Sequence, residues 1–362
     1  MLDAWLTPSL LNWNLVPKRR DSVLVPKLRD KYSCIRGTTL FSLFLTQIDQ
    51  MKLSTPVALQ LLDKKIDYHS RLLWLGSCFA DNMGNQFAQL GFTQTTNPFG
   101  ILFQPLALQQ LVDRALQDKV YTRADLIFHN DLWHCFELHS DCSNPDSEAM
   151  LDDLNAKQQL LKSQLQQATH IGITLGTAWV YRHLASDRVV ANCHKIPQSA
   201  FAKELLSLAE IESALQQLIS TIHAVNPNVQ LVFTISPVRH SKDGLVENQR
   251  SKAQLLVALH QVLETHKAYY FPAYELLLDE LRDYRFYADD LLHPSPLAIR
   301  YIWEKWLSVT TTPETQALIA EVEAIQKSRQ HRAFNPDTEE HAIFLEKLEK
   351  RERDLLEKGV RI

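Results

Sequence analysis

A serine and a histidine form the pair in this sequence that is best suited to acyl transfer. Ser77 follows the apolar run 72–75 and Gly76, and apolar residues at helical spacing begin directly after it. This pattern predicts a strand, a tight turn at the glycine and a helix that starts at the serine. Open α/β sheets bind ligands at such positions, and the amides of a helix N-terminus stabilise a developing negative charge. A purely structural serine in a strand–turn–helix connection is the alternative.

The histidine lies in the motif D-x-x-H-P-S at residues 290–295. Asp290 precedes His293 by three residues, so its carboxylate can hold one ring nitrogen and leave the other to face a serine. A doubly wound sheet brings loops that are distant in sequence to one edge. Ser77, His293 and Asp290 are therefore the predicted nucleophile, general base and orienting carboxylate.

Two other chemistries fit residues close to these motifs. Cys78 is a thiol at the same predicted helix N-terminus, where thiol pKa values fall, although a cysteine there more often packs inward. Cys193, His194 and His240 form a metal site only if their loops converge, and no two of them have the i, i+4 spacing of helical ligands. We therefore expect no metal and no other cofactor.

Strands and helices alternate from residue 51 onward, and this alternation must position the motifs. Strands are expected near residues 72–76, 92–95, 171–175, 230–235 and 268–272. Helices are expected at 79–90, 105–116, 150–168, 203–225 and 246–266, with an irregular aromatic insertion beside the site at 127–138. The pattern predicts a three-layer α/β/α domain with a mainly parallel five-stranded sheet in the order 2-1-3-4-5.

The two ends of the chain depart from this pattern. Residues 1–50 hold seven Lys or Arg and four Asp without clear periodicity. We expect them to be a poorly ordered arm or an upstream artefact, with Met51 as the true start. Residues 51–310 form the predicted α/β domain. Residues 311–362 are the predicted C-terminal helical extension, packed on the domain with its charged face in solvent.

Composition narrows the class of partner. The chain has 362 residues and a net charge of −4, which argues against nucleic acid or a membrane surface as partner. No run approaches the ~20 apolar residues of a membrane span. Five cysteines without a C-x-x-C pair predict reduced thiols and a cytoplasmic location. The expected partner is a small molecule, and the oligomeric state stays open.

The residues 76–80 spell G-S-C-F-A, and the chain resembles the GSCFA domain family, which is grouped with the SGNH (GDSL-like) hydrolases. The resemblance covers about residues 51–350. Besides the G-S-C-F-A motif it rests on N-P-F-G at 97–100, L-G-T-A-W at 175–179, N-C-H-K at 192–195, S-P-V-R-H at 236–240, the histidine motif, and H-R-A-F-N-P at 331–336.

The resemblance implies a flavodoxin-like α/β/α hydrolase with the same three catalytic residues. In SGNH enzymes the nucleophilic serine, a glycine and an asparagine form the oxyanion hole, so Ser77 and Gly100 are the expected first two donors. Ala178 stands where the asparagine is usual, and the loss of one such donor typically costs ~10²–10³ in rate. Asn192 is the candidate replacement.

The predicted substrate contacts follow strand ends at the same edge of the sheet. They are Trp179, His194, Arg239 and His240. The predicted activity is that of a serine esterase or acyltransferase that acts on small O-acyl groups, such as an acetyl ester on a sugar or glycan. The alternatives are a non-catalytic binding module with the same fold and a metal-dependent hydrolase that uses His194 and His240.

Overall fold

A five-stranded parallel sheet forms the centre of the domain in the computed structural model, which describes residues 54–330 and 338–361. Its strands are β1 (Arg71–Gly76), β2 (Thr93–Thr96), β5 (His170–Leu175), β9 (Gln230–Ile235) and β10 (Tyr269–Tyr270). The strand order is β2-β1-β5-β9-β10, and each neighbouring pair is parallel. The predicted sheet is therefore confirmed, and the carboxyl ends of its strands meet at one edge.

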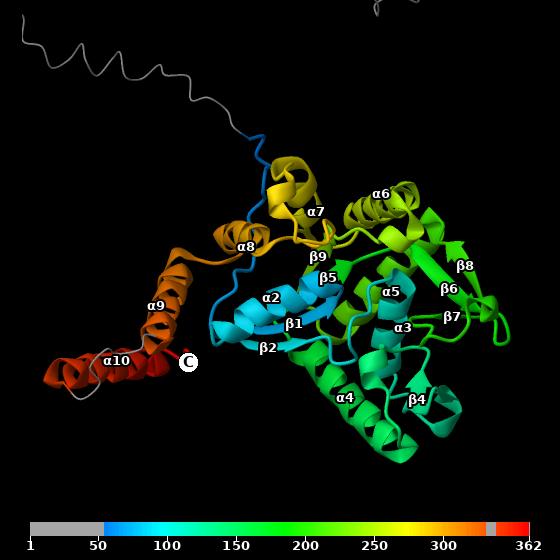
Figure 1. Cartoon of the computed structure of the whole chain (residues 1–362), viewed down its shortest axis with the longest axis horizontal. Helices are drawn as coiled ribbons and strands as arrows, with labels where there is room; N and C mark the ends of the chain where they lie inside the picture. Colours follow the sequence, from blue (N-terminus) through cyan, green and yellow to red (C-terminus); the bar gives the residue numbers. More distant parts are fainter. Residues whose placement is uncertain (1–53, 331–337, 362) are drawn as a thin grey trace, which may run out of the picture. The chain divides into compact units, whose positions relative to one another are not determined.

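Alternate residues of the central strands face opposite helical layers, as a sheet covered on both sides requires. On β1, Leu73 and Leu75 join one core cluster, whereas Leu72 and Trp74 join the other. The first cluster packs against α3 (Pro105–Leu116), α4 (Ser147–Gln167), α5 (Leu208–Val225) and α6 (Leu245–Leu263). The second packs against α2 (Cys78–Gln89), α7 (Ala273–Glu275), α8 (Pro296–Thr310), α9 (Pro313–Gln330) and α10 (Glu339–Glu357). The result is a three-layer, flavodoxin-like α/β/α fold (Figure 1).

The C-terminal helices belong to the second layer. Val322 of α9 and Leu355 of α10 are buried in the same cluster as Trp74 of the sheet. Gly91, at φ 79°, lets the chain end approach so closely that any Cβ there would overlap the carbonyl oxygen of Arg361. The last two helices are thus packed on the α/β layers.

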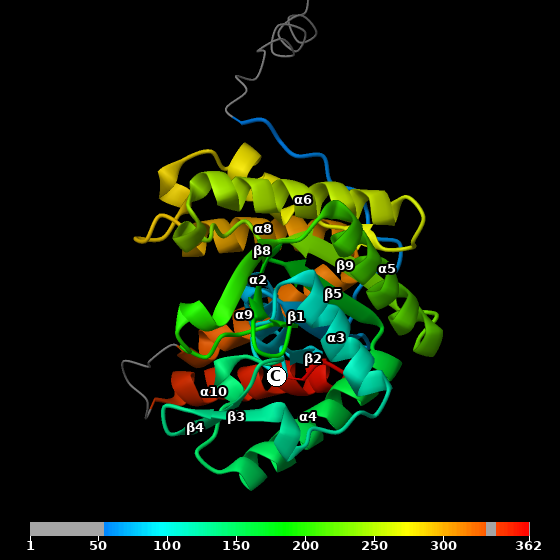
Figure 2. The same cartoon turned by 90° about the vertical axis from the view of Figure 1, so that its right-hand side faces the viewer.

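Two antiparallel elements differ from the expectation. The prediction of an irregular segment at 127–138 is wrong, because β3 (Leu126–His129) and β4 (Leu132–Cys135) form a hairpin. The predicted helix 203–225 begins only at α5, because β8 (Phe201–Leu205) precedes it. Strand β8 pairs with β6 (Trp179–His183), which also pairs with β7 (Arg188–Val190). Both views place this second sheet beside α6 (Figures 1 and 2).

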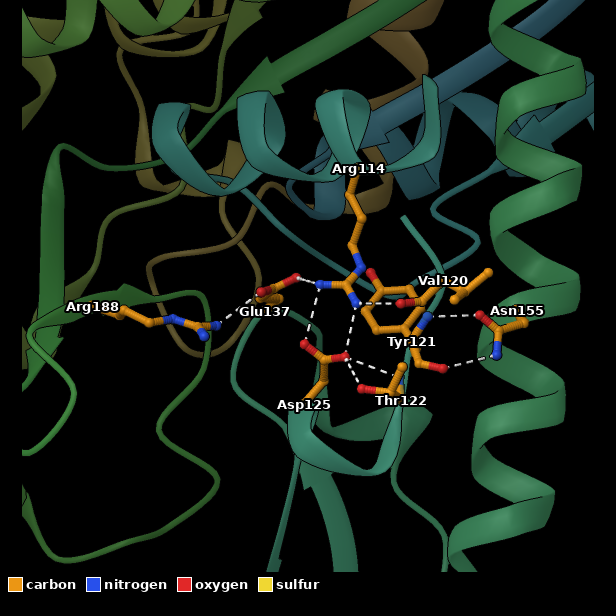
Figure 3. Close-up of polar contacts among 8 residues, drawn as sticks. All are labelled: Arg114, Val120, Tyr121, Thr122, Asp125, Glu137, Asn155 and Arg188. Carbon is orange, nitrogen blue, oxygen red and sulfur yellow. Dashed lines mark hydrogen bonds and ion pairs between the residues drawn. The ribbon is translucent and has the colours of Figure 1, made fainter. Parts of the chain in front are cut away.

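The Arg114 network, made of Arg114, Asp125, Glu137 and Arg188, attaches the hairpin to α3. The Arg114 side chain is 4% exposed, and its guanidinium binds Asp125 at 2.9 Å and Glu137 at 3.0 Å. Glu137 also binds Arg188 at 2.9 Å (Figure 3). Because two carboxylates alternate with two guanidinium groups, the charge of the network is balanced.

The expectations for residues 1–50 and for a start at Met51 fall outside the described residues, as does the motif at 331–336. Within residues 54–330 and 338–361, no helix combines the length and the apolar character needed to cross a membrane.

Candidate active site

The turn between β1 and α2 presents Ser77 at the carboxyl edge of the sheet. Gly76 has φ 127°, and a Cβ there would lie 2.2 Å from the carbonyl oxygen of Thr174, so only glycine lets β1 end against β5. Ser77 is the N-cap of α2, is 5% exposed, and its Oγ accepts the N–H of Phe79 at 3.4 Å. The predicted strand–turn–helix geometry is confirmed.

Asn97 holds this turn from the loop after β2. Its Oδ1 accepts the N–H of Gly76 at 2.9 Å, and its Nδ2 donates to Asp81 in the first turn of α2 at 2.6 Å. The Asn97 N–H donates in addition to the Trp74 carbonyl at 2.9 Å. One side chain therefore fixes the glycine before Ser77 and the helix after it.

Asp290 and His293 form the pair that their spacing predicts. Asp290 Oδ2 lies 2.5 Å from His293 Nδ1, and its Oδ1 accepts the N–H groups of Leu292 and His293 at 2.9 Å each. Hydrogen bonds from the backbone and the ring of His293 lower the pKa of Asp290 to about 2. With Nδ1 held by the carboxylate, Nε2 is the ring nitrogen that remains to accept a proton.

Ser77 and His293 line one cavity of about 470 Å³. Three of the four predicted substrate contacts line it as well: Trp179, Arg239 and His240. The second sheet supplies one wall through residues of β6 and β7, so the strands that the sequence did not predict help to shape the site. Within the described residues no hydrogen bond joins Ser77 to His293.

The structure does not bring His194 or Asn192 to this cavity. His194 is 3% exposed, with its Nε2 2.7 Å from the Cys135 carbonyl oxygen and its Nδ1 3.0 Å from Ser140 Oγ. Asn192 Oδ1 accepts the His194 N–H at 2.9 Å. Burial lowers the pKa of His194 to about 4, so a neutral ring braces the β3–β4 hairpin against this loop. His194 was predicted to contact substrate and Asn192 to replace the missing oxyanion donor, and neither residue lines this cavity.

The expected oxyanion donors are already engaged. The Ser77 N–H donates to the Thr174 carbonyl at 3.1 Å, and the Gly100 N–H donates to the Asn97 carbonyl at 2.8 Å. Gly100 also lies outside the residues that line the cavity. Ala178, at the position of the usual asparagine, is fully buried and has no side-chain donor. The N–H groups of Ser77 and Gly100 are therefore not free hydrogen-bond donors in this structure.

Comparison with protein-family models matches residues 71–306 to the GSCFA family and residues 322–360 to the C-terminal domain of GSCFA domain proteins. The chain belongs to the GSCFA family. The first match contains Ser77 and the Asp290–His293 pair, and the second contains α10. A search of curated proteins finds no match.

Lys252 is a buried residue of this GSCFA protein that sequence reasoning missed. It is 0% exposed, and its Nζ donates to the carbonyl oxygens of Gly176 at 2.5 Å and Ser236 at 2.6 Å. It therefore ties together the ends of β5 and β9 at the edge that carries the cavity. Its spacing to Leu255 and Leu259 places it on the apolar face of α6. Helical periodicity could therefore have indicated from the sequence that this lysine is buried.

Gln104 is a second buried residue that the sequence did not indicate. It is 5% exposed and lines the cavity with Ser77. It occupies the N-cap position of α3 without forming a side-chain cap, and its Oε1 has no hydrogen-bond partner. Leaving a buried polar atom unpaired costs about 1–3 kcal/mol of stability. Nothing in the local sequence reveals this burial, because it arises where α3 meets β5.

The thiol and metal alternatives lack the geometry and electrostatics that they require in this GSCFA protein. Burial raises the pKa of the Cys78 thiol, whereas a thiolate nucleophile needs a lowered pKa. Both ring nitrogens of His194 are hydrogen-bonded, so His194 is not free to join His240 at a metal. Across the described part of the chain, no three His, Cys, Asp or Glu side chains are grouped as metal ligands.

Proposed function

We propose that this GSCFA protein is a serine-dependent esterase or acyltransferase of the SGNH type. Its substrates are small O-acyl esters, carbohydrate O-acetyl groups included, and its intermediate is an acyl-enzyme at Ser77. The observation that carries the proposal is the presence of a helix-capping Ser77 and an Asp290-held His293 in one cavity. A nucleophile, a base and an orienting carboxylate are the parts that acyl transfer needs.

In the proposed reaction Ser77 Oγ bonds to the acyl carbon while His293 Nε2 accepts the hydroxyl proton. The carbonyl electron pair moves onto the acyl oxygen, and the positive imidazolium is stabilised by Asp290. When the carbonyl re-forms, the ester C–O bond breaks and the alcohol leaves with the proton from His293. Water or a second alcohol then attacks the acyl-enzyme and gives its proton to His293. The bond between Ser77 Oγ and the acyl carbon breaks, Ser77 Oγ takes the proton back from His293, and an acid or a new ester is released.

The lining of the cavity supports a polar ester as substrate. Arg239 and Lys242 place two cations at the cavity. Asp243, its one carboxylate, is paired with Lys203 at 2.5 Å. Trp179 offers an aromatic wall of the kind that packs against sugar rings, and its Nε1 is held by the Glu247 carbonyl at 3.2 Å. A hydroxyl-rich or anionic alcohol portion fits this lining.

A cytoplasmic location is part of the proposal. The four cysteines in the described residues are Cys78, Cys135, Cys142 and Cys193, and all are free. Free thiols are typical of a reducing compartment. The mechanism uses no cofactor, since the nucleophile and the base are side chains of the protein.

A non-catalytic binding module is the second candidate. It is favoured by the engagement of the Ser77 and Gly100 N–H groups in backbone hydrogen bonds, which leaves the expected oxyanion hole incomplete. Such a module would bind the same esters in the cavity without turnover. The two candidates differ in whether Ser77 reacts.

Hydrolysis of short-chain acyl esters by the full-length protein tests the proposal. Ser77→Ala and His293→Ala should each remove nearly all activity, and the double variant should be little worse, because the two residues act as one unit. Asp290→Asn should reduce activity by a comparable or smaller factor. Asp289→Asn, at the neighbouring exposed carboxylate, is the matched control and should keep most activity. Full activity in Ser77→Ala contradicts the proposal, and an inactive parent protein favours the binding module.

A further inference from the structure

Gln104 has a hydrogen-bonding capacity that the folded protein does not use. Its side chain lines the cavity, and its Oε1 is enclosed and has no hydrogen-bond partner. It also forms no cap on α3, although it stands at the N-cap position. Its Nε2 is not enclosed and also forms no hydrogen bond within the described residues. Polar groups in buried side chains are almost always paired, so a free donor at a cavity indicates a partner that arrives with the ligand.

Two backbone hydrogen bonds attach Ser77 and Phe103, the residue before Gln104, to the carboxyl end of β5. The Ser77 N–H donates to the Thr174 carbonyl at 3.1 Å, and the Gly176 N–H donates to the carbonyl of Phe103, the neighbour of Gln104, at 2.7 Å. Thr174 and Gly176 are two residues apart at the carboxyl end of β5. Both side chains therefore enter the cavity from positions set by one rigid strand.

The carboxamide presents its donor end to the cavity. The enclosed Oε1 leaves the N–H2 group as the end of the side chain that a ligand can reach. A donor in the same cavity as a nucleophilic serine suits the oxygen on which negative charge develops during attack, and such donors are most effective when they are fixed in advance. Pro105 restricts the backbone directly after Gln104 and begins α3, so this position is pre-organised.

We propose that Gln104 is a catalytic residue whose carboxamide N–H2 donates a hydrogen bond to the acyl oxygen of the tetrahedral intermediate at Ser77. This role rests on the proposed function. It supplies a donor that the engaged N–H groups of Ser77 and Gly100 do not supply and that Ala178 lacks. The hydrogen bond forms as the carbonyl electron pair moves onto the acyl oxygen, and no proton leaves Gln104.

The test compares Gln104→Met with Gln110→Met in the full-length protein. Met has a similar length and no donor, so kcat should fall by ~10²–10³ with little change in KM. The melting temperature should stay the same or rise, because the folded protein loses no hydrogen bond. Gln110 is exposed on the same helix, and Gln110→Met should keep the kcat of the parent. Gln104→Glu, which keeps the shape and removes the N–H2 donor, should lower kcat at neutral pH in the same way.

Reaction of the parent protein with a fluorophosphonate separates failure of this role from failure of the proposed function. An unlabelled Ser77 in an inactive parent protein overturns the proposed function and the role of Gln104 with it. A labelled, active parent protein whose kcat is unchanged in Gln104→Met overturns only the role of Gln104. A loss of kcat that only follows a lowered melting temperature and a smaller folded fraction also overturns it.

Discussion

Arg114 and Lys252 are both buried cations, yet they are held by different kinds of partner. The guanidinium of Arg114 contacts the carboxylates of Asp125 and Glu137, and it donates in addition to the Val120 carbonyl at 2.9 Å. The ammonium group of Lys252 donates to the two backbone carbonyl oxygens at the ends of β5 and β9. The first cation is neutralised where it lies, and the second has no anionic hydrogen-bond partner among the described residues.

We interpret this difference as one between a part of the protein that stabilises the fold and the part that carries the proposed active site. The charge-balanced Arg114 network joins a hairpin to a helix. At the cavity edge, burial lowers the pKa of Lys252 to about 7, and Gln104 keeps an unpaired carboxamide oxygen. Groups that break the usual pairing rules tend to gather at functional sites. Lys252 and Gln104 place two such groups at the cavity edge.

The largest expected effect is on stability, in the Arg114 network. Arg114→Met should lower the free energy of unfolding by about 3–5 kcal/mol, because Asp125 and Glu137 lose their buried partner. The kcat of the folded protein should not change. Arg188 also pairs with Glu137, but its own side chain is 58% exposed. Arg188→Met should therefore lower the free energy of unfolding by less than about 1 kcal/mol. Urea unfolding measures both variants, and equal losses would contradict a structural role for the buried cation.

Lys252→Met should lower the free energy of unfolding less than Arg114→Met does, and it should lower kcat, which Arg114→Met leaves unchanged. It leaves two carbonyl oxygens without donors, at about 1–3 kcal/mol, and the removal of a buried charge offsets part of that loss. Release of the strand ends should lower kcat by roughly 10- to 100-fold, as small misplacements in an active site do. Ester hydrolysis corrected for the folded fraction is the measurement. A Lys252→Met protein with parental kcat would show that the two buried cations do not differ in function.

Between pH 6.5 and 4, the pH dependence of stability should come from buried histidines and not from Asp125 of the Arg114 network. Burial lowers the pKa of His170 and of His194 to about 4, below the usual 6.5. Between pH 6.5 and 4 the unfolded chain therefore binds more protons, and stability should fall with pH by up to about 1.4 kcal/mol per unit for each histidine. Although burial opposes it, hydrogen bonds from Thr122 and Arg114 lower the pKa of Asp125, which stays charged in this range.

Urea unfolding at several pH values measures that slope in the parent protein and in His194→Asn. The variant should be less sensitive to acid than the parent between pH 6.5 and 4. An unchanged slope in His194→Asn would mean that His194 does not bind a proton on unfolding, and would contradict the assignment.

The parallel sheet could be predicted because its three central strands, β1, β5 and β9, are largely buried and form short apolar runs between periodic helices. The second sheet could not, because its strands are short and partly exposed. In β8, Lys203 and Glu204 are polar residues that fit the helical periodicity of α5, so the sequence predicts a helix that begins at Lys203. Ser207 is the signal that separates the two, because it caps α5 together with Glu210.

The catalytic candidates could be predicted where a local motif carries them. Ser77 follows a strand and a glycine, and Asp290 and His293 are three residues apart, so each motif is complete within a few residues. Gln104 and Lys252 could not be singled out in this way, because their burial depends on how α3 and α6 pack against β5. His194 was misplaced for the same reason, since its loop folds back onto the Cys135 carbonyl.

The most direct test of the central claim is the site of covalent labelling by a fluorophosphonate, determined by peptide mass analysis of the full-length protein. We expect one adduct on Ser77, its absence in Ser77→Ala, and much slower labelling in His293→Ala, because His293 must accept the hydroxyl proton. Cys78→Ser should still be labelled at Ser77. An adduct on Cys78, or ester hydrolysis by a protein in which Ser77 is never labelled, would contradict the account.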